Sequence, residues 1–276
     1  MSATSLQYRR GALGLLFGLL AGLGLSTTLS GTAAAATDLT RAGAEAEVVR
    51  LLNQQRAAAG KVALRVDGRL TTIARYRSTD MATKHYFSHE QPDGRYAWDM
   101  LTPAGILWYS ASENIAWNEK PTLRESAAGT GTQWRNSPPH YATTIDADLN
   151  YIGVGVTTDD AGRRLWTAVY MKGPDRTGGW GRMETPLVAS STMSTTTVTL
   201  TWHGGDIRLS ILTAGLRDFT VQRRVDGAAW QAFRTATTAN SWKGSLARGH
   251  RYDFRVRSRD RAGNLSAWSR VITVRP

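Results

Sequence analysis

The stretch YIGVGVTTDDAGRRLWTAVYM, residues 151–171, has the strongest strand pattern in the first half of the chain. Its apolar runs, 151–156 and 165–171, have the length and the β-branched and aromatic content of strands, and the turn residues 159–163 join them. The stretch therefore predicts an antiparallel hairpin. Because helical patterns precede the hairpin, the order of elements favours an α+β layer architecture over alternating strands and helices with a parallel sheet.

Four segments upstream of the hairpin are predicted to be helical. The first covers 44–59 and closes at Gly60, and the second begins near Asp67, a good N-cap residue. Its apolar stripe has helical spacing and consists of Leu70, Ile73, Ala74 and Met81. A short helix is expected around 98–101. The fourth, about 123–134, has to end by Ser137-Pro138-Pro139, because proline cannot continue a helix. A short strand is expected at 114–117.

Residues 1–36 have the order of segments of a secretory signal peptide. Arg9 and Arg10 precede an uncharged, largely apolar run at 12–25, and small residues follow up to AAAA at 33–36. The apolar run is shorter than the roughly 18 residues of a membrane-spanning helix. We therefore expect cleavage after Ala35 or Ala36 and a secreted, extracellular or cell-wall-associated protein. General secretory and twin-arginine export both remain open.

The 276-residue chain has no cysteine, so neither disulfides nor a lipidated cysteine is available to it. Its net charge of +12 is unevenly distributed. Residues 37–182 contain 18 basic and 16 acidic residues, whereas residues 183–276 contain 14 basic and 6 acidic residues. The basic character therefore belongs to the C-terminal part. The Gly- and Pro-rich segment 173–186 between the two parts is predicted to be a linker.

Five motifs follow one another in the first part: LLNQQRAAAG at 51–60, DMATKHYFSHEQPDG at 80–94, SENIAW at 112–117, WRNSPPH at 134–140 and YIGVGV at 151–156. In this order they resemble the bacterial branch of the CAP superfamily, which comprises cysteine-rich secretory proteins, antigen 5 and pathogenesis-related proteins. The resemblance covers about residues 43–172. It implies a three-layer α-β-α sandwich with a large cleft lined by histidines and glutamates.

Position by position, the resemblance implies that His89, Glu113 and His140 lie in this cleft. The second glutamate of animal and plant members falls on Ser137 here, so the tetrad becomes a triad, and any mechanism that needs two carboxylates is in doubt. Facing imidazoles suit zinc or another divalent metal, with Glu113 as a third ligand or as a base for bound water. Buried His and Glu also pair simply to satisfy each other. Both interpretations stay open.

Catalytic motifs are otherwise weak. His85 and His89 lack the adjacent glutamate of the HExxH zinc proteases, and His85 is interpreted as a surface residue. Serines stand beside the triad residues, but no GxSxG motif occurs. The sequence does not decide whether the protein is an enzyme, and with one carboxylate it favours binding over catalysis.

The second part, residues 187–276, alternates polar and apolar residues in several short runs separated by turns, which predicts about seven strands in a β-sandwich. The runs and the closing GNLSAWS at 263–269 resemble an immunoglobulin-like fibronectin type III domain. Arg255, Arg257 and Arg259 share one strand face and form either a solvated face or a surface that binds a cell-wall or extracellular polyanion. No nucleic-acid recognition motif is present.

These observations predict a secreted two-domain protein. Its His/Glu cleft is expected to bind a divalent metal and a small apolar or glycan-derived ligand, and its basic second domain to position it at a surface or matrix. Two alternatives remain: a cell-wall or peptide hydrolase that uses Glu113 with the two cleft histidines, and a non-catalytic adhesin.

Overall fold

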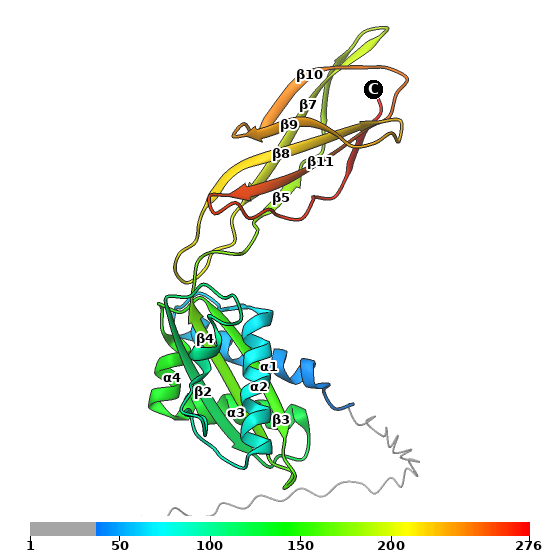
Figure 1. The fold of residues 1–276 in the computed structure, drawn as a ribbon. Coiled ribbons are helices and arrows are strands. Elements are labelled where there is room, and N and C mark those ends of the chain that lie inside the picture. The colour runs from blue at the N-terminus through cyan, green and yellow to red at the C-terminus, as the bar shows by residue number, and fades with distance from the viewer. Residues whose placement is uncertain (1–36) are drawn as a thin grey trace, which may run out of the picture. The chain divides into compact units, whose positions relative to one another are not determined.

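The computed structural model describes residues 37–276, and the predicted signal peptide, residues 1–36, lies outside this range. The first part of the described chain combines helices with one sheet (Figure 1). Its helical elements are α1 (Arg41–Ala58), α2 (Gly68–Thr83), the short 3-10 helix η1 (Ala97–Met100), α3 (Leu123–Asn136) and α4 (Pro138–Ile145). Its strands are β1 (Arg65–Val66), β2 (Ser110–Asn118), β3 (Tyr151–Thr158) and β4 (Arg164–Lys172).

The sheet has the strand order β1-β3-β4-β2. The predicted hairpin is confirmed as β3 and β4, which pair antiparallel, while β2 pairs with β4 and is an edge strand. Alternate side chains of the sheet pack against α2 on one face and against α1 and α3 on the other. The α+β layer architecture predicted from the sequence is therefore confirmed for this part.

Two glycines of β3 allow α2 to lie directly on the sheet. A β-carbon on Gly153 would be 2.1 Å from the backbone of Leu70, and one on Gly155 would be 2.3 Å from the backbone nitrogen of Arg75. These contacts involve backbone atoms, which cannot rotate away. The two glycines of the GVG sequence at 153–155 thus set how closely α2 approaches β3.

Helix α4 was not predicted, because Pro138 and Pro139 were expected only to end the preceding helix. They also begin the next one: proline is favoured in the first turn, where its missing N–H leaves no hydrogen bond unmade. Ser137 is the residue between the two helices. His140 therefore lies in the first turn of α4 and not in a loop.

The second part is all-β. One antiparallel sheet contains β5 (Trp180–Met183), β6 (Leu187–Ser191), β7 (Thr195–Gly205) and β10 (Ser241–Ala247). The other contains β8 (Leu216–Val225), β9 (Gln231–Thr237), β11 (Tyr252–Asp260) and β12 (Ile272–Val274) in the order β12-β11-β8-β9. The buried apolar residues of both sheets form one core, so the sheets make a sandwich. Strand β5 lies within 173–186, the segment expected to be a linker. No helix between residues 37 and 276 is long and apolar enough to cross a membrane.

Replacing Gly155 by alanine is expected to lower the free energy of unfolding by about 2–3 kcal/mol, because the added methyl group forces α2 away from β3. Urea unfolding measures the effect. Gly68→Ala is the matched control, since a β-carbon there meets nothing within 4 Å. Equal effects of the two substitutions would contradict the close approach of α2 to the sheet.

Candidate functional site

His89 and Glu113 form a hydrogen-bonded pair at the sheet edge. Nδ1 of His89 lies 2.8 Å from Oε2 of Glu113, which β2 contributes. The Glu113 side chain is only 1% exposed, whereas the His89 ring is 45% exposed. A carboxylate can only accept a hydrogen bond, so Nδ1 of His89 carries a proton, and in the neutral form of the ring Nε2 is an acceptor. Glu113 thus orients the ring from beneath it.

Arg77 of α2 holds the other side of the same carboxylate. Its Nε lies 2.9 Å from Oε1 of Glu113, and neither side chain is more than 1% exposed. Burial lowers the pKa of Arg77, but the hydrogen bond and charge of Glu113 more than offset this and the pKa is raised. Both carboxylate oxygens are therefore engaged, Oε1 by Arg77 and Oε2 by His89. Because Glu113 is also buried, its oxygens face Arg77 and His89 and do not line the groove.

Arg77 also fixes the segment that carries His89. It donates hydrogen bonds to the hydroxyl of Tyr86 (2.6 Å) and to the carbonyl oxygens of Ser88 (2.7 Å) and His89 (2.9 Å). Arg77 was not predicted as a site residue, although the sequence carries a signal for its burial. Arg77 lies on the predicted apolar stripe of α2, three residues after Ala74 and four before Met81.

His140 approaches the same site from α4. Its Nδ1 lies 2.8 Å from the hydroxyl oxygen of Ser137, and its carbonyl oxygen accepts a hydrogen bond from the Asn114 side chain at 3.0 Å. Burial and, to a lesser extent, the charge of His89 lower the pKa of His140 below its ordinary value of 6.5. The imidazole of His140 is therefore neutral at pH 7, the form that binds metals and accepts protons.

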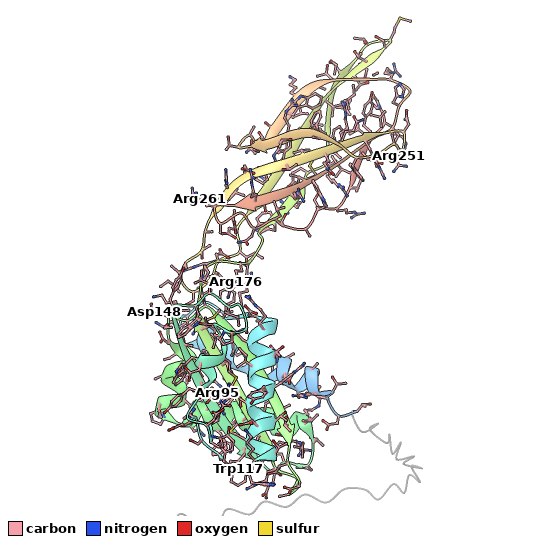
Figure 2. The ribbon with its side chains drawn as sticks, viewed as in Figure 1. Arg95, Trp117, Asp148, Arg176, Arg251 and Arg261 are labelled. Atoms are coloured by element: carbon pink, nitrogen blue, oxygen red, sulfur yellow. The ribbon has the colours of Figure 1, made fainter. Side chains whose placement is uncertain are left out.

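One depression brings the two histidines together. It has a volume of about 490 Å³ and is lined by Phe87, Ser88, His89, Glu90, Tyr96, Ile115 and His140. A second depression of about 440 Å³ shares Phe87, Ile115 and His140 with it and extends to Trp117, Gln133 and Ser137. Trp117 is labelled in Figure 2. The sequence-predicted residues are thus gathered at one groove, with Glu113 buried below it and not part of its lining.

The free edge of β2 is blocked beside this groove. The indole nitrogen of Trp134 donates to the carbonyl oxygen of Ile115 at 3.0 Å, and the amide of Gln133 donates to that of Trp117 at 3.1 Å. Side chains of α3 therefore occupy carbonyl groups that an added strand would need. A ligand of the groove is expected to contact side chains and not to extend the sheet.

The triad does not form a three-ligand metal cluster. Within residues 37–276, the three-member His/Cys/Asp/Glu group whose ligand atoms all lie within 4.8 Å of one another is instead Asp175, Asp206 and Asp260. Backbone N–H groups of neighbouring turns donate to each of these carboxylates, which accounts for their placement. At the groove, the metal-ligating groups of the lining are the two imidazoles and the exposed carboxylate of Glu90, which accepts a hydrogen bond from the Tyr96 hydroxyl at 3.2 Å.

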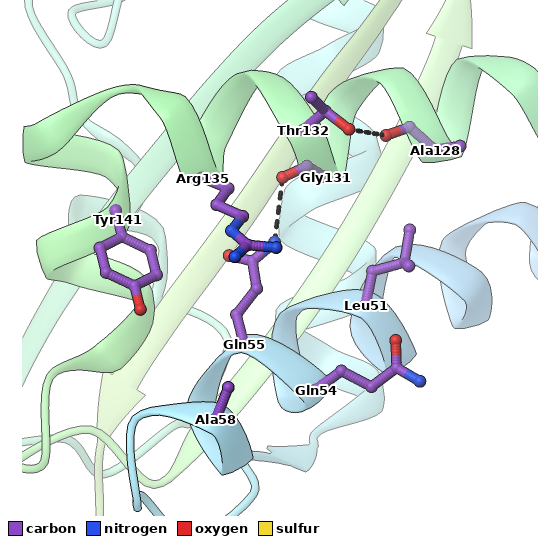
Figure 3. A pocket seen from close by; sticks show the side chains of 9 residues that line it. All are labelled: Leu51, Gln54, Gln55, Ala58, Ala128, Gly131, Thr132, Arg135 and Tyr141. Carbon is purple, nitrogen blue, oxygen red and sulfur yellow. Dashed lines mark hydrogen bonds between the residues drawn. The ribbon is translucent and has the colours of Figure 1, made fainter.

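A separate pocket of about 270 Å³ lies among α1, α3 and α4 (Figure 3). It is lined by Leu51, Gln54, Gln55, Ala58, Ala128, Gly131, Thr132, Arg135 and Tyr141. None of these residues is an imidazole or a carboxylate. This pocket therefore lacks both metal ligands and groups that exchange protons near neutral pH. His85, whose ring is 62% exposed, lines neither this pocket nor the two depressions of the groove.

Replacing Arg77 by methionine is expected to lower the free energy of unfolding by about 3–5 kcal/mol, because the buried carboxylate of Glu113 loses its guanidinium partner and keeps only the hydrogen bond from His89. Urea unfolding tests this, with the exposed Arg95 (Figure 2) changed to methionine as the control. The double variant Arg77→Met/Glu113→Gln should recover part of the loss, since no unpaired charge remains. Similar losses for Arg77→Met and Arg95→Met would contradict the role of the buried pair.

His140 is expected to titrate below pH 6.5 in an NMR experiment. His89→Ala should raise its pKa only in part, since burial is the larger cause. Because the unfolded chain takes up this proton at a higher pH, the contribution of His140 to stability is present above pH 6.5 and is lost as the pH falls through the folded-state pKa. A midpoint at or above 6.5 would contradict the burial of this ring.

Comparison with known proteins identifies the first part of the chain. Residues 49–170 match the CAP family model, described as the cysteine-rich secretory protein family. The uncharacterized protein YkwD of Bacillus subtilis is 32% identical over 127 residues, which are 46% of this chain and 46% of that protein.

Two solved structures also match. The first is an extracellular protein containing a SCP domain from Bacillus anthracis, which is 26% identical in sequence. The match covers 48% of this chain and 41% of that chain, with a TM-score of 0.42. The second is an outer surface protein of Borrelia burgdorferi, which is 14% identical in sequence. The match covers 50% of this chain and 98% of that chain, with a TM-score of 0.44. The aligned residues are less than half of the Bacillus subtilis protein YkwD. The family model and the YkwD alignment together identify residues 49–170 as a CAP domain.

Proposed function

We propose that the CAP domain binds a divalent cation such as zinc, together with a small ligand, in the groove between His89 and His140. The supporting observation is that both imidazoles line one depression while each has its Nδ1 engaged by a neighbouring side chain. The Nε2 atoms are thereby left for a ligand.

The donor set fits a cation that is not fully enclosed by the protein. Structural zinc sites have four protein ligands and catalytic sites usually three, whereas the lining here offers two histidines and the exposed carboxylate of Glu90. Glu113 takes the place of the outer carboxylate that commonly orients a metal-binding histidine. When bound, such a cation supplies a Lewis acid. Water or the second ligand then has to complete its coordination.

The groove beyond the histidines fits a ligand with an apolar part. Phe87 and Trp117 are 46% and 42% exposed, and Ile115 lies between the two depressions as a wall of both. Gln133 and Ser137 add polar groups beside Trp117. Aromatic faces with a few polar groups suit a small apolar molecule or a fragment of a glycan.

We also propose that the protein acts outside the cell, at its surface or wall. The predicted signal peptide supports this, as do the descriptions of the Bacillus anthracis and Borrelia burgdorferi proteins as extracellular and outer surface proteins. The all-β second part is proposed to be a fibronectin type III domain, on the basis of its two antiparallel sheets and shared core. Its proposed use is to position the CAP domain.

A hydrolase is the second candidate, and hydrogen bonds of the groove favour it in a modified form. Glu113 is covered and paired with Arg77, so His89, oriented by Glu113, takes the part of the base. Ser137 and His140 add a hydroxyl–imidazole contact of 2.8 Å. Fragments released from purified cell walls or a peptide library by the parent, but not by Glu113→Gln, would support this activity.

Zinc is expected to bind the chain of residues 37–276 in a calorimetric titration, and His89→Ala with His140→Ala should abolish binding. Glu113→Gln should weaken it by about 10- to 100-fold, since the carboxylate orients His89. His85→Ala is the control, because His85 is exposed and lies outside the groove lining. An unchanged zinc titration in the His89→Ala/His140→Ala variant would contradict the proposed cation site.

A further inference from the structure

The β-sandwich carries a stack of alternating arginine and tryptophan side chains. We call it the arginine–tryptophan ladder, and it consists of Arg224, Trp230, Arg255, Trp268 and Arg257. The guanidinium carbon of Arg255 lies 4.3 Å from the ring centre of Trp230 and 4.4 Å from that of Trp268. Arg224 lies 4.7 Å from Trp230 and Arg257 lies 4.5 Å from Trp268. All four distances are within the range of cation–π interactions.

The ladder lies on the face of β8 and β11 that points away from the core. Along β11 the buried Phe254 and Val256 alternate with the partly exposed Arg255 and Arg257. Arg255 pairs across the strands with Gln222 of β8, whose side-chain oxygen accepts two hydrogen bonds from it at 2.9 and 2.7 Å. The alternation that buries the core thus places these arginines outside.

Backbone hydrogen bonds hold Trp268 in place. Ser266 N–H donates to the carbonyl oxygen of Ser258 at 2.9 Å, and Ser269 N–H donates to that of Val256 at 2.8 Å. In return, the hydroxyls of Ser266 and Ser269 accept from the N–H groups of Ser258 and Val256, both at 3.0 Å. The indole between the two serines is therefore fixed against β11, and so are the guanidinium groups stacked on it.

Two arginines of the ladder have no counterion. Arg224 pairs with Asp253 at 2.8 Å, and Arg259, farther along β11, pairs with Asp218 at 2.6 Å. No carboxylate lies within 4.0 Å of Arg255 or Arg257 in the described range 37–276. Nε of Arg257 is buried and has no hydrogen-bond partner there. Burial lowers the pKa of Arg255, and the adjacent charges of Arg224 and Arg257 lower it further. Arg259, which was predicted to act with Arg255 and Arg257, has its charge balanced by Asp218.

The stacking decides which ligand chemistry fits. Each indole already carries two guanidinium groups, so the ladder does not offer a bare aromatic platform for a sugar ring or a nucleobase. Nε and Nη2 of Arg255 donate to Gln222, and Nε of Arg257 is buried, so the donors left for a ligand lie at the terminal Nη1–Nη2 edge of each guanidinium group. Two N–H groups on this planar edge match two oxygens of a phosphate. Two fixed cations also favour a ligand that repeats its charge over a single small anion.

We propose that Arg255 and Arg257 form a binding site for the phosphate groups of a phosphodiester polymer at the cell surface. Stacking on Trp268 holds both side chains before binding, so little side-chain entropy is lost when the ligand arrives. The excess of 14 basic over 6 acidic residues in 183–276 attracts the polymer at longer range. This site is independent of the CAP groove.

The test measures binding of the chain of residues 37–276 to immobilised poly(glycerol phosphate) at several salt concentrations. Arg257→Gln is expected to weaken binding about tenfold, the effect of one lost charge-assisted contact, and to reduce its salt dependence. Arg257→Lys, which keeps the charge but loses the planar fork, should lie between it and the parent. Arg275→Gln removes the same charge from an exposed position and should change binding less than about twofold.

Equal losses in Arg257→Gln and Arg275→Gln would overturn the proposal, since the attraction would then come from net charge alone. Equal or tighter binding of polyglutamate of matched charge would overturn the choice of phosphate as the ligand, and tighter binding of duplex DNA would overturn the choice of a cell-surface polymer as its source. Thermal unfolding checks that each variant is folded, and if Arg257→Gln is not, the comparison of Arg257→Lys with Arg275→Gln decides. Loss of zinc binding in His89→Ala/His140→Ala should leave polymer binding unchanged, so the two proposals fail separately.

Discussion

The site depends on one buried ion pair, Arg77 with Glu113. Such a pair adds little net stability, because removing both charges from water costs about as much as their attraction returns. Its effect here is positional. Arg77 ties helix α2 to the edge strand β2 and, through three further hydrogen bonds, to the segment that ends in His89. Glu113 then fixes the tautomer of His89.

The edge strand also explains how two histidines from different layers meet. Glu113 and Asn114 are neighbours in β2, so their side chains point to opposite faces of the sheet. Glu113 contacts His89 on the α2 side, and Asn114 donates to the carbonyl oxygen of His140 in α4, on the other side. The groove lies at the sheet edge because only there can groups from both layers reach one another. A shift of one residue in the register of β2 would exchange the two contacts.

Sequence periodicity predicted the layers better than it predicted partners. The stripe on α2, the Asp67 cap and the hairpin were all recovered, because burial and turn chemistry leave local patterns. Arg77 was missed, since a charged residue on an apolar stripe reveals burial but not which carboxylate it meets. Helix α4 was missed because proline was considered only as a terminator. Arg259 was grouped with Arg255 and Arg257 because all three share one face of the strand. Its ion-pair partner, Asp218, lies on another strand and could not be recognised from the sequence.

Three buried or partly buried arginines show why desolvation alone does not distinguish structural from binding residues. Arg56 is fully buried and donates to the carbonyl oxygens of Val62, Thr144 and Asp146, and Arg77 donates to a carboxylate, a hydroxyl and two carbonyls. Their N–H groups are used within the protein. Arg257 is covered by an indole, which interacts with the face of the guanidinium and accepts none of its N–H groups in the plane. Stacking therefore immobilises Arg257, while its terminal Nη1 and Nη2 groups have no hydrogen-bond partner among residues 37–276, and that combination is what an anion requires of a preformed site.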